Sequence, residues 1–370
     1  MAKDTTKVTG NINTTRTLTS KRTADALLHA FKKQRPVMLW GPPGIGKSEV
    51  VASLGNTLKR EVIDVRLALW DPTDLKGIPF FNPDSKAMDW APPIELPQDP
   101  NSNAILFFDE LPSAVPATQA AAYQLIHNRR VGRYVLPRGV DMVAAGNRES
   151  DRGVTYKMPK PLANRFLHIE MAVDFDSWFE WAVDRGVHAD VVGYLSFAKQ
   201  DLMSFDARSP EHAFATPRSW KFVSDLLDDE DDGNINDITL ADLVTGAVGD
   251  GMCYKFMAHR KVSSRMPNPS DVLDGKIKKI EFKDVSALYS LTVSLCYELK
   301  ERSAKKNDKW YEAIDNYFYF MNDNFPTELV VMGAKVMLYN YNLSPEPDRM
   351  KSFDTFFDKY GKYIVGASTE

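Results

Sequence analysis

The segment that most constrains the fold lies early in the chain, at residues 41–48. It reads Gly-Pro-Pro-Gly-Ile-Gly-Lys-Ser and matches the phosphate-binding loop pattern, in which a glycine-rich turn joins a strand to a helix. An apolar run at residues 37–40 precedes it, and a helical pattern over residues 48–59 follows it. Such glycines let backbone N–H groups face phosphate oxygens, and the start of the helix adds its positive end. The segment therefore predicts a nucleotide-phosphate site within an α/β fold.

The last two residues of this loop carry its predicted chemistry. Lys47 is expected to reach the β- and γ-phosphates of ATP, and Ser48 is expected to hold Mg²⁺ through its hydroxyl group. The residues predicted to bind the nucleotide are Gly41, Pro42, Pro43, Gly44, Ile45, Gly46, Lys47 and Ser48.

A second motif follows about sixty residues later. Residues 104–108 form an apolar run that ends in Asp109 and Glu110. A buried parallel strand delivers such carboxylates to the edge of the sheet where ligands bind. We expect Asp109 to help hold Mg²⁺ and Glu110 to polarise the attacking water. Together with the phosphate-binding loop, this pair predicts an enzyme that binds and hydrolyses Mg-ATP.

The pattern of apolar residues in the sequence changes near the middle of the chain. Up to about residue 174, short apolar runs typical of buried parallel strands alternate with helical patterns, which predicts a parallel sheet flanked by helices over residues 20–174. These runs are residues 37–40, 62–65, 104–108, 142–145 and 167–170. Residues 1–19 are polar and predict a flexible arm. Beyond residue 174 helical periodicity takes over, and the acidic residues 228–234 predict a solvated loop.

Length and composition narrow the class of protein. A chain of 370 residues favours two domains. The net charge of −4, from 46 basic and 50 acidic side chains, argues against nucleic-acid binding through overall charge, although a local basic groove stays open. Two cysteines, Cys253 and Cys296, leave no disulfide framework, and no apolar run is long enough to span a bilayer. We expect a soluble, cytoplasmic protein without a membrane segment.

Three segments together resemble the AAA+ ATPases of the P-loop NTPase superfamily. They are the phosphate-binding loop, residues 107–110 (Phe-Phe-Asp-Glu) and residues 144–148 (Ala-Ala-Gly-Asn-Arg). Softer similarity to the MoxR-like branch lies in residues 71–77, 162–166 and 215–220 (Asp-Pro-Thr-Asp-Leu-Lys-Gly, Leu-Ala-Asn-Arg-Phe and Ala-Thr-Pro-Arg-Ser-Trp). The resemblance covers about residues 20–275. It implies a five-stranded parallel sheet and a small helical lid over residues 175–275, followed by a helical C-terminal extension over residues 276–370 that resembles no named family.

The resemblance also implies roles for three further polar residues. Asn147 looks like the sensor-1 residue that orients the lytic water. Arg165 resembles the arginine finger that reaches the γ-phosphate of a neighbouring subunit, with a surface salt bridge as the alternative. Arg218 resembles the sensor-2 arginine of the lid, and its action in cis or in trans stays open. With Glu110, these are the predicted catalytic residues.

Residues 75–96 contain several aromatic residues and prolines but few charges. In the MoxR-like branch a hairpin that lines the central pore lies here, so exposed Phe80 and Phe81 would suit contact with a polypeptide. Alternatively, Phe80, Phe81 and Trp90 pack the hairpin onto its own domain. The sequence leaves both interpretations open.

The family resemblance implies a chaperone ATPase that remodels or activates a protein partner. The expected working form is a ring, with a hexamer as the expected size, and the first expected partner carries a von Willebrand factor A domain. Two alternatives differ in class. A nucleic-acid motor or nuclease-associated translocase is disfavoured by the near-neutral charge. A nucleotide-locked scaffold without turnover is disfavoured by the intact Glu110.

Overall fold

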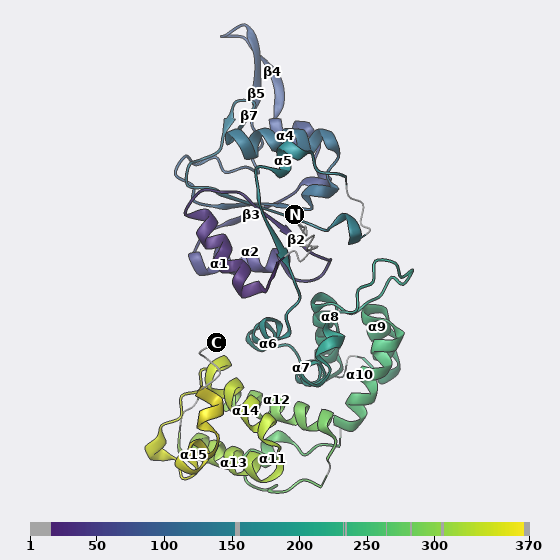
Figure 1. The fold of residues 1–370 in the computed structure, drawn as a ribbon, viewed down its shortest axis with the longest axis vertical. Coiled ribbons are helices and arrows are strands. Elements are labelled where there is room, and N and C mark those ends of the chain that lie inside the picture. The colour runs from purple at the N-terminus through teal and green to yellow at the C-terminus, as the bar shows by residue number, and fades with distance from the viewer. Residues whose placement is uncertain are drawn as a thin grey trace, which may run out of the picture. The chain divides into compact units, whose positions relative to one another are not determined.

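The computed structural model describes residues 16–365, except for residues 152–155, 232, 234, 264, 282, 305 and 306. The chain divides into two compact units, Met1–Val173 and Asp174–Glu370 (Figure 1). Most of the predicted arm, residues 1–19, lies outside the described residues. Its described end, Thr17 and Leu18, forms a short strand instead of continuing as an arm.

The first unit is built on a six-stranded sheet in which every neighbouring pair is parallel. The order is β1-β10-β2-β9-β6-β3. The strands are β1 (Thr17–Leu18), β2 (Val37–Trp40), β3 (Val62–Arg66), β6 (Ile105–Asp109), β9 (Asp141–Gly146) and β10 (Leu167–Met171). The five predicted apolar runs all form strands. The implied number of five is wrong by one, because β1 pairs with the end of β10 and adds an edge strand.

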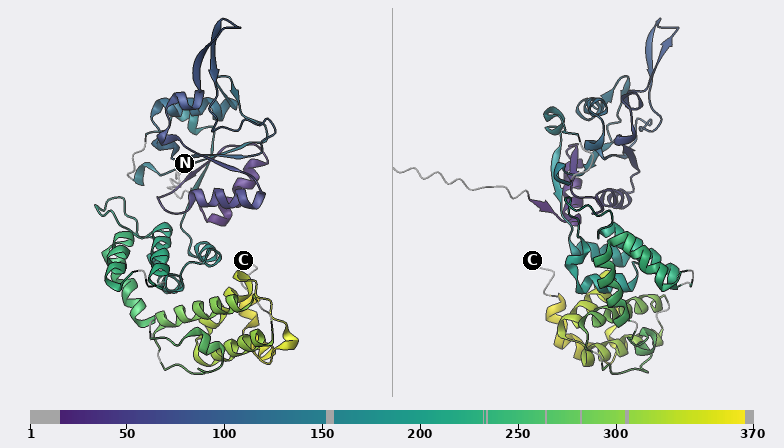
Figure 2. Two further views of the ribbon diagram at one scale, coloured as in Figure 1. Left: turned by 180° about the vertical axis from the view of Figure 1, so that it is seen from behind. Right: turned by 90° about the vertical axis from the view of Figure 1, so that its right-hand side faces the viewer.

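Helices cover both faces of this sheet (Figure 2). They are α1 (Ser20–Phe31), α2 (Lys47–Leu58), α3 (Pro72–Lys76), α4 (Pro116–Asn128) and α5 (Lys160–Ala163). Alternate strand residues Met38, Leu106 and Ala144 belong to one buried cluster with Leu125 of α4, while α2 contacts the opposite face over β3, β6 and β9. Since apolar side chains are buried on both faces, the strands read as continuous apolar runs.

The strand order places the ends of three strands together. Strand β9 lies between β2 and β6, with Leu39 beside Ala145 and Phe107 beside Val143. All three strands run in the same direction, so their carboxyl ends share one edge of the sheet. The residues that follow β2 and β9, and those that end β6, therefore meet there.

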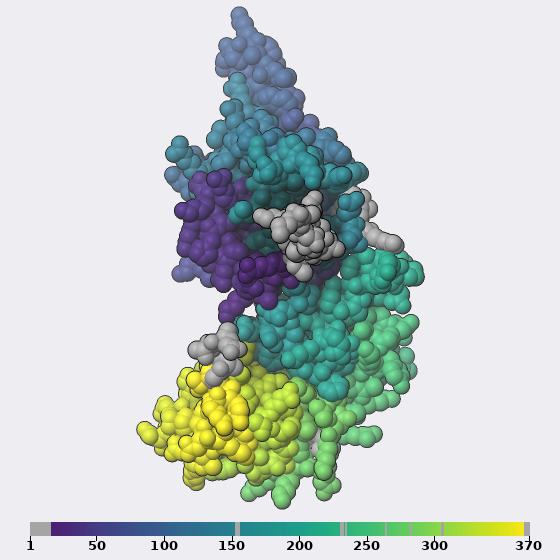
Figure 3. Space-filling view, in the orientation of Figure 1, coloured from purple at the N-terminus to yellow at the C-terminus, as the bar shows by residue number. Residues whose placement is uncertain are grey.

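Two small antiparallel sheets accompany the six-stranded sheet in this unit. One is a hairpin of β4 (Ile78–Asn82) and β5 (Ala87–Ala91), seen at the extreme of the first unit in Figure 3. The other pairs β7 (Arg130–Val131) with β8 (Tyr134–Val135) directly after α4. Sequence similarity implied the first hairpin and did not indicate the second.

The regular elements that the structure describes in the second unit are all helices. Its helices are α6 (Phe175–Asp184), α7 (Ala189–Phe197), α8 (Pro217–Asp231), α9 (Asp237–Val248), α10 (Asp250–Ser263), α11 (Pro269–Leu273), α12 (Val285–Arg302), α13 (Asp308–Asn324), α14 (Thr327–Lys335) and α15 (Phe353–Val365). The loop predicted at residues 228–234 is wrong in its first part, because α8 continues to residue 231.

Short single-turn elements complete the fold: η1 (Leu67–Leu69), η2 (Leu111–Ser113), η3 (Glu149–Asp151), η4 (Lys199–Leu202), η5 (Val336–Asn340, a π-helix) and η6 (Pro347–Arg349). Large aromatic side chains, among them Trp220, Trp310 and Tyr317, are fully buried in the second unit. None of the helices in the described ranges has the length and apolar character that crossing a bilayer requires.

Candidate functional site

The predicted phosphate-binding loop joins the end of β2 to the start of α2. Gly46 is the residue before α2, and its backbone is left-handed, with φ 90° and ψ 25°. A side chain at such a position costs roughly 1–2 kcal/mol, and glycine avoids that cost. This conformation lets the helix begin at Lys47, so that the first turn of α2 offers its backbone N–H groups to the end of the loop.

The ammonium group of Lys47 lies at the centre of the loop. Its Nζ atom donates hydrogen bonds to the carbonyl oxygens of Gly41 at 2.7 Å and Pro42 at 2.9 Å, and to Oδ1 of Asn147 at 2.9 Å. The side chain is buried, and a buried cation is tolerated when such acceptors surround it. Two residues predicted from separate motifs, Lys47 and Asn147, are thus in direct contact.

Ser48 and Asp109 are also brought together, as the sequence predicts. The Ser48 hydroxyl donates to Oδ2 of Asp109 at 3.3 Å, and the other carboxylate oxygen, Oδ1, accepts from the backbone N–H of Glu110 at 3.0 Å. A hydroxyl and one carboxylate suit Mg²⁺, which is usually bound through one or two protein oxygens together with substrate phosphates. Within the described ranges no group of three or more His, Cys, Asp or Glu residues is arranged to hold a metal.

A further carboxylate near this pair was missed by sequence reasoning. Asp64 lies on β3, the edge strand that pairs with β6. Burial raises the pKa of Asp64, and the negative charge of Asp109 raises it further, while Arg66 opposes both effects. Asp64 therefore adds to the negative potential in which Asp109 lies. Asp64 interrupts the apolar run of β3, and this was the feature of the sequence that could have identified it.

Glu110 has an uncommon backbone conformation. Its φ of 55° and ψ of 32° are left-handed, and its side chain is exposed. A non-glycine residue in this region costs roughly 1–3 kcal/mol and persists only where its surroundings hold it. Here η2 follows at once, with Leu111 and Pro112 buried. Strain of this kind is concentrated at functional sites.

Asn147 is positioned by a close backbone approach. It directly follows Gly146, the last residue of β9. A Cβ atom at Gly146 would lie 2.3 Å from Cδ of Pro112 and 3.0 Å from Cε of Met38. Only glycine fits between these neighbours, so the end of β9 packs directly against the segment that follows Glu110. Sequence reasoning noted Asn147 but missed the glycine that positions it.

Arg165 follows α5 and contacts α4. Its Nε atom donates to Nδ1 of His127 at 2.9 Å, and its guanidinium lies 6.0 Å from the ring centroid of Tyr123. The Tyr123 and His127 rings are stacked with their centroids 5.5 Å apart. Among the described residues, Arg165 is thus held by two rings of one helix. Its role as a finger stays a prediction, and neither ring partner was identified from the sequence.

Arg218 belongs to the second unit. It is the second residue of α8, and its side chain is exposed. The start of this helix is held by a reciprocal pair, because the backbone N–H of Ser219 donates to Oγ1 of Thr216 at 3.0 Å and that of Thr216 donates to Oγ of Ser219 at 2.8 Å. The sensor-2 role of Arg218 stays a prediction.

The β4–β5 hairpin exposes the aromatic side chains that the sequence singled out. The exposed fraction is 45% for Phe80 and 69% for Phe81. Trp90 is half-buried and lies near Gly132 of the β7–β8 turn, where an added Cβ would lie 4.0 Å from Cγ of Trp90, and buried Asp89 pairs with Arg133 at 2.7 Å. Packing onto the domain therefore describes Trp90 and not the two phenylalanines. Contact with a polypeptide stays a prediction.

Comparisons with known proteins agree with this geometry in the first unit. Residues 36–166 match the family model described as the AAA domain of the dynein-related subfamily. This range contains the phosphate-binding loop, Asp109, Glu110, Asn147 and Arg165. This part of the chain is therefore similar to an AAA domain. No curated protein matches the sequence.

Several solved structures resemble the chain distantly. A Cytophaga hutchinsonii protein with a provisional ATPase name is 14% identical, with 93% of this chain and 90% of that chain covered and a TM-score of 0.35. A RuvB variant of Thermotoga maritima is 16% identical (70% and 75% covered, TM-score 0.38). NtrX of Brucella abortus, solved with ADP, is 15% identical (66% and 68% covered, TM-score 0.33). At these identities and scores the likenesses assign no activity.

Proposed function

We propose that this chain, whose residues 36–166 match the AAA-domain model, binds Mg-ATP and hydrolyses it to remodel or activate a protein partner. The observation that carries the proposal is the convergence of four side chains at one edge of the sheet. Lys47 contacts Asn147 at 2.9 Å, and Ser48 contacts Asp109 at 3.3 Å. The residues proposed to bind phosphate, to hold Mg²⁺ and to orient water are thus adjacent.

Each of these residues has a physical role in the proposal. Lys47 and the backbone N–H groups of the loop bind the phosphates, and Ser48 and Asp109 would hold Mg²⁺. The ion, when bound, neutralises charge on the β- and γ-phosphate oxygens. Glu110 accepts a proton from the attacking water, and Asn147 orients that water. Arg165, and Arg218 in the second unit, add positive charge against the transition state.

The finer part of the proposal concerns assembly and client. We place the chain in the MoxR-like branch and expect a ring, with six subunits as the first size to test. The exposed Phe80 and Phe81 support contact with a polypeptide, because exposed aromatic side chains are enriched where proteins are bound. A protein with a von Willebrand factor A domain is the partner to test first.

The deciding experiment separates binding from turnover. Glu110→Gln should bind Mg-ATP with unchanged affinity and lower the hydrolysis rate roughly a hundredfold or more, because it retains shape and removes the base. Lys47→Ala should weaken ATP binding about tenfold or more, because charged hydrogen bonds are lost. Calorimetric titration with Mg-ATP measures the binding affinity of both variants, and phosphate release measures their hydrolysis rates.

A matched control is Glu61→Gln. Glu61 is an exposed glutamate directly before β3, at the amino edge of the same sheet. Its substitution should change neither binding nor turnover. Turnover near the wild-type rate in Glu110→Gln would reject Glu110 as the base, and unchanged ATP affinity in Lys47→Ala would reject the nucleotide site itself.

A further inference from the structure

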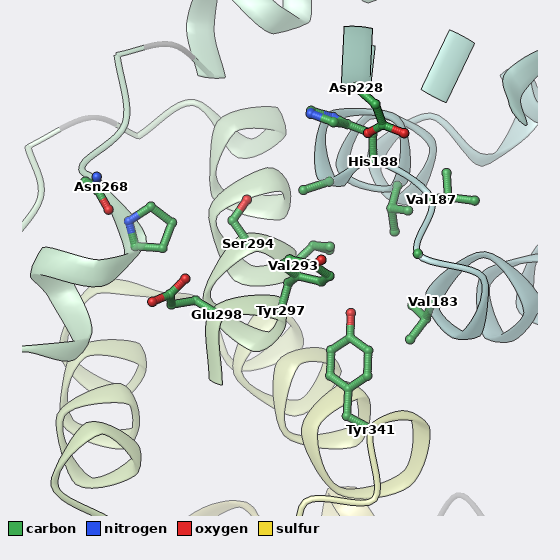
Figure 4. Close-up of a pocket in the computed structure, with 14 residues that line it drawn as sticks. Val183, Val187, His188, Asp228, Asn268, Val293, Ser294, Tyr297, Glu298 and Tyr341 are labelled. Carbon is green, nitrogen blue, oxygen red and sulfur yellow. The ribbon is translucent and has the colours of Figure 1, made fainter. Parts of the chain in front are cut away.

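The proposed ATPase activity leaves unused a cavity in the second unit and a basic surface on the first. The cavity has a volume of about 320 Å³ and is lined by residues of α6, α7, α8, α11 and α12 (Figure 4). Several of its polar and aromatic groups already have partners within the protein. Glu298 accepts a hydrogen bond from Nε of Arg302 at 2.9 Å, and the ring centroid of Tyr341 lies 4.8 Å from Nζ of Lys300. The lining therefore indicates no particular ligand.

The basic surface lies at the amino edge of the six-stranded sheet, opposite the edge that Lys47 and Asp109 share. It is formed by the segments that precede four consecutive strands of the sheet, β2, β9, β6 and β3. In that order the segments are residues 32–36, 138–140, 99–104 and 59–61. Because neighbouring strands lie about 4.8 Å apart, the four strand starts span roughly 14 Å.

Side-chain hydrogen bonds hold these segments together. Gln34 donates from Nε2 to the carbonyl oxygen of Arg138 at 2.9 Å, which joins the segment before β2 to the segment before β9. The guanidinium of Arg60 donates to the carbonyl oxygens of Ala104 and Gly139, both at 3.1 Å. These contacts fix the backbone of all four segments relative to one another, so their exposed side chains form one continuous surface.

Exposed cations outnumber exposed carboxylates on this surface. The five exposed cations are Lys32, Lys33, Arg35, Lys59 and Arg138. Among the carboxylates that the structure describes, none forms an ion pair with these five side chains. The exposed carboxylates of the same segments are Glu61 and Asp99, while Asp141 is buried and pairs with Arg60 at 2.8 Å. The surface therefore has a net positive charge that is not neutralised within the first unit.

The composition of the surface favours a phosphate backbone over a protein partner. Of the large apolar side chains that the structure describes as exposed, none lies in these segments. Protein interfaces are instead enriched in aromatic residues and methionine and depleted in lysine. The helix dipole accounts for a cation at the end of α1 or α2, but Arg35 and Arg138 lie outside helices. The segments also contain no aromatic residue on which the bases of a single strand could stack.

We propose that this surface binds double-stranded nucleic acid through its phosphate backbone, without sequence preference. Each strand of a duplex carries a phosphate about every 3.4 Å along the helix axis, so a surface of roughly 14 Å reaches three or four phosphates of one strand. Lysine and arginine side chains neutralise these phosphates and release their counterions. The proposal goes beyond the ATPase activity and does not depend on it. Because the nucleotide site lies at the opposite edge of the sheet, a bound duplex leaves that site open.

Fluorescence anisotropy of the full chain with a labelled DNA duplex of about 20 base pairs tests the chemistry. We expect saturable binding at about 50 mM salt that duplexes of unrelated sequence compete equally well. Between about 50 and 200 mM salt, the logarithm of the binding constant should fall against the logarithm of the salt concentration with a slope of about −3 to −4. Polyglutamate and phosphatidylserine vesicles are the comparison anions. Absence of saturable duplex binding, or binding of either comparison anion as tight as that of the duplex, would overturn the proposal.

Three variants then locate the site. Lys33→Gln with Arg35→Gln should weaken duplex binding about tenfold or more and make the salt slope shallower by about two. Lys21→Gln with Arg22→Gln removes the same two charges from exposed positions at the other end of α1, and should have no effect. Glu61→Gln removes an exposed carboxylate from the surface itself, so it should tighten binding about twofold. Equal losses in the two double variants, or unchanged binding in the first, would reject this surface as the site.

Further measurements separate this proposal from the ATPase and from subunit assembly. Both double variants should retain the basal ATPase rate and the melting temperature of the wild type, since the substituted side chains are exposed and lie outside the nucleotide site. Loss of duplex binding with normal hydrolysis would therefore support the proposal even if the assigned roles in hydrolysis were wrong. Light scattering follows the oligomeric state. If Lys33→Gln with Arg35→Gln abolishes assembly and leaves duplex binding intact, the surface is a subunit contact and the proposal is rejected.

Discussion

The Nε atom of Arg165 donates a hydrogen bond to Nδ1 of His127 at 2.9 Å. The geometry requires an acceptor at the Nδ1 position, and the Tyr123 ring stacked on His127 limits the movement of the imidazole. If Arg165 acts on the γ-phosphate, His127 is a positioning residue for it. His127→Ala should then lower the hydrolysis rate about fivefold, because a hydrogen bond contributes about 1 kcal/mol.

A conservative variant separates positioning from folding. In His127→Asn the amide oxygen replaces Nδ1 as acceptor at a similar distance from the backbone, so the rate should recover. His127 is exposed on α4, and neither variant should change the melting temperature by much. Equal rates in the alanine and asparagine variants would show that the Arg165 contact has no catalytic consequence.

Replacing Phe80 and Phe81 of the β4–β5 hairpin should impair function without lowering stability. Because both side chains are exposed, Phe80→Ala with Phe81→Ala should change the free energy of unfolding by no more than about 0.5 kcal/mol. The double variant should retain basal ATPase activity and lose the part that a protein partner stimulates. Trp90→Ala is the matched control. Since Trp90 is half-buried beside Gly132, its truncation should destabilise the first unit by about 1 kcal/mol or more. A large drop in melting temperature for the double variant would contradict the functional interpretation.

The close packing around Gly146 predicts that a larger residue at this position would disturb the nucleotide site. An added Cβ would lie 2.3 Å from Pro112, so Gly146→Ala should cost about 1–3 kcal/mol and displace Asn147 from Lys47. Gly246 in α9 is a useful comparison, because a Cβ there meets nothing within 4 Å. Gly246→Ala should stabilise by roughly 0.5–1 kcal/mol through helix propensity. Thermal melting and ATP titration test both variants, and a tolerated alanine at position 146 with normal ATPase activity would contradict the argument.

A buried histidine predicts how the second unit responds to acid. Burial lowers the pKa of His259 below 6.5, although Asp190 and Asp284 oppose the shift, and its Nε2 contacts Oγ of Ser290 at 2.7 Å. The unfolded chain therefore binds a proton more readily than the folded one. Stability should be constant with pH above about 7 and should fall as the pH drops through about 6.5.

This pH effect is measured as the change in melting temperature between pH 7.5 and pH 5.5. His259→Gln retains a hydrogen-bonding side chain that does not titrate, so the acid-induced change should become smaller. An identical pH profile in the variant would assign the effect to other groups.

The parts of the site that lie within single motifs could be predicted from sequence. Lys47, Asp109 and Asn147 each follow or end an apolar strand, and parallel strands bring their carboxyl ends to one edge, which made their meeting predictable. Asp109 ends β6 and Asn147 directly follows β9, and these two strands are neighbours in the observed order. The strand β1 was missed because two residues are too few to show any periodicity.

Contacts between distant segments could not be predicted. His127 and Arg165 are 38 positions apart, and nothing in either segment indicates that the end of α4 lies beside the turn after α5. The fit of Pro112 against Gly146 is of the same kind, since it depends on the packing distance between two strands' ends. The acidic end of α8 was misread because charge density predicts exposure to solvent, and an exposed helix satisfies that as well as a loop does.

The final prediction concerns a shared active site. Arg165 lies between α5 and β10, and the proposal has it act on the nucleotide of a neighbouring subunit. A residue that acts in trans differs from one that acts in cis, because two different defective variants can complement each other. Lys47→Ala and Arg165→Ala subunits should each be inactive alone. A mixture forms some interfaces in which an intact loop faces an intact arginine, so hydrolysis should reappear.

The size of the recovered activity follows from the energetics of such arginines. They accelerate phosphoryl transfer by roughly 10³–10⁵ where they act in trans, so a minority of repaired interfaces should exceed the background of either variant. The recovery should also rise with protein concentration, because it requires assembly. Mixing His127→Ala with Lys47→Ala provides a control, since each intact loop that faces a Lys47→Ala neighbour meets an Arg165 still positioned by His127, so the rate per intact loop should rise above that of His127→Ala alone. If subunits exchange, shown by labelled chains, and the mixture of the first two variants stays inactive, Arg165 does not act in trans.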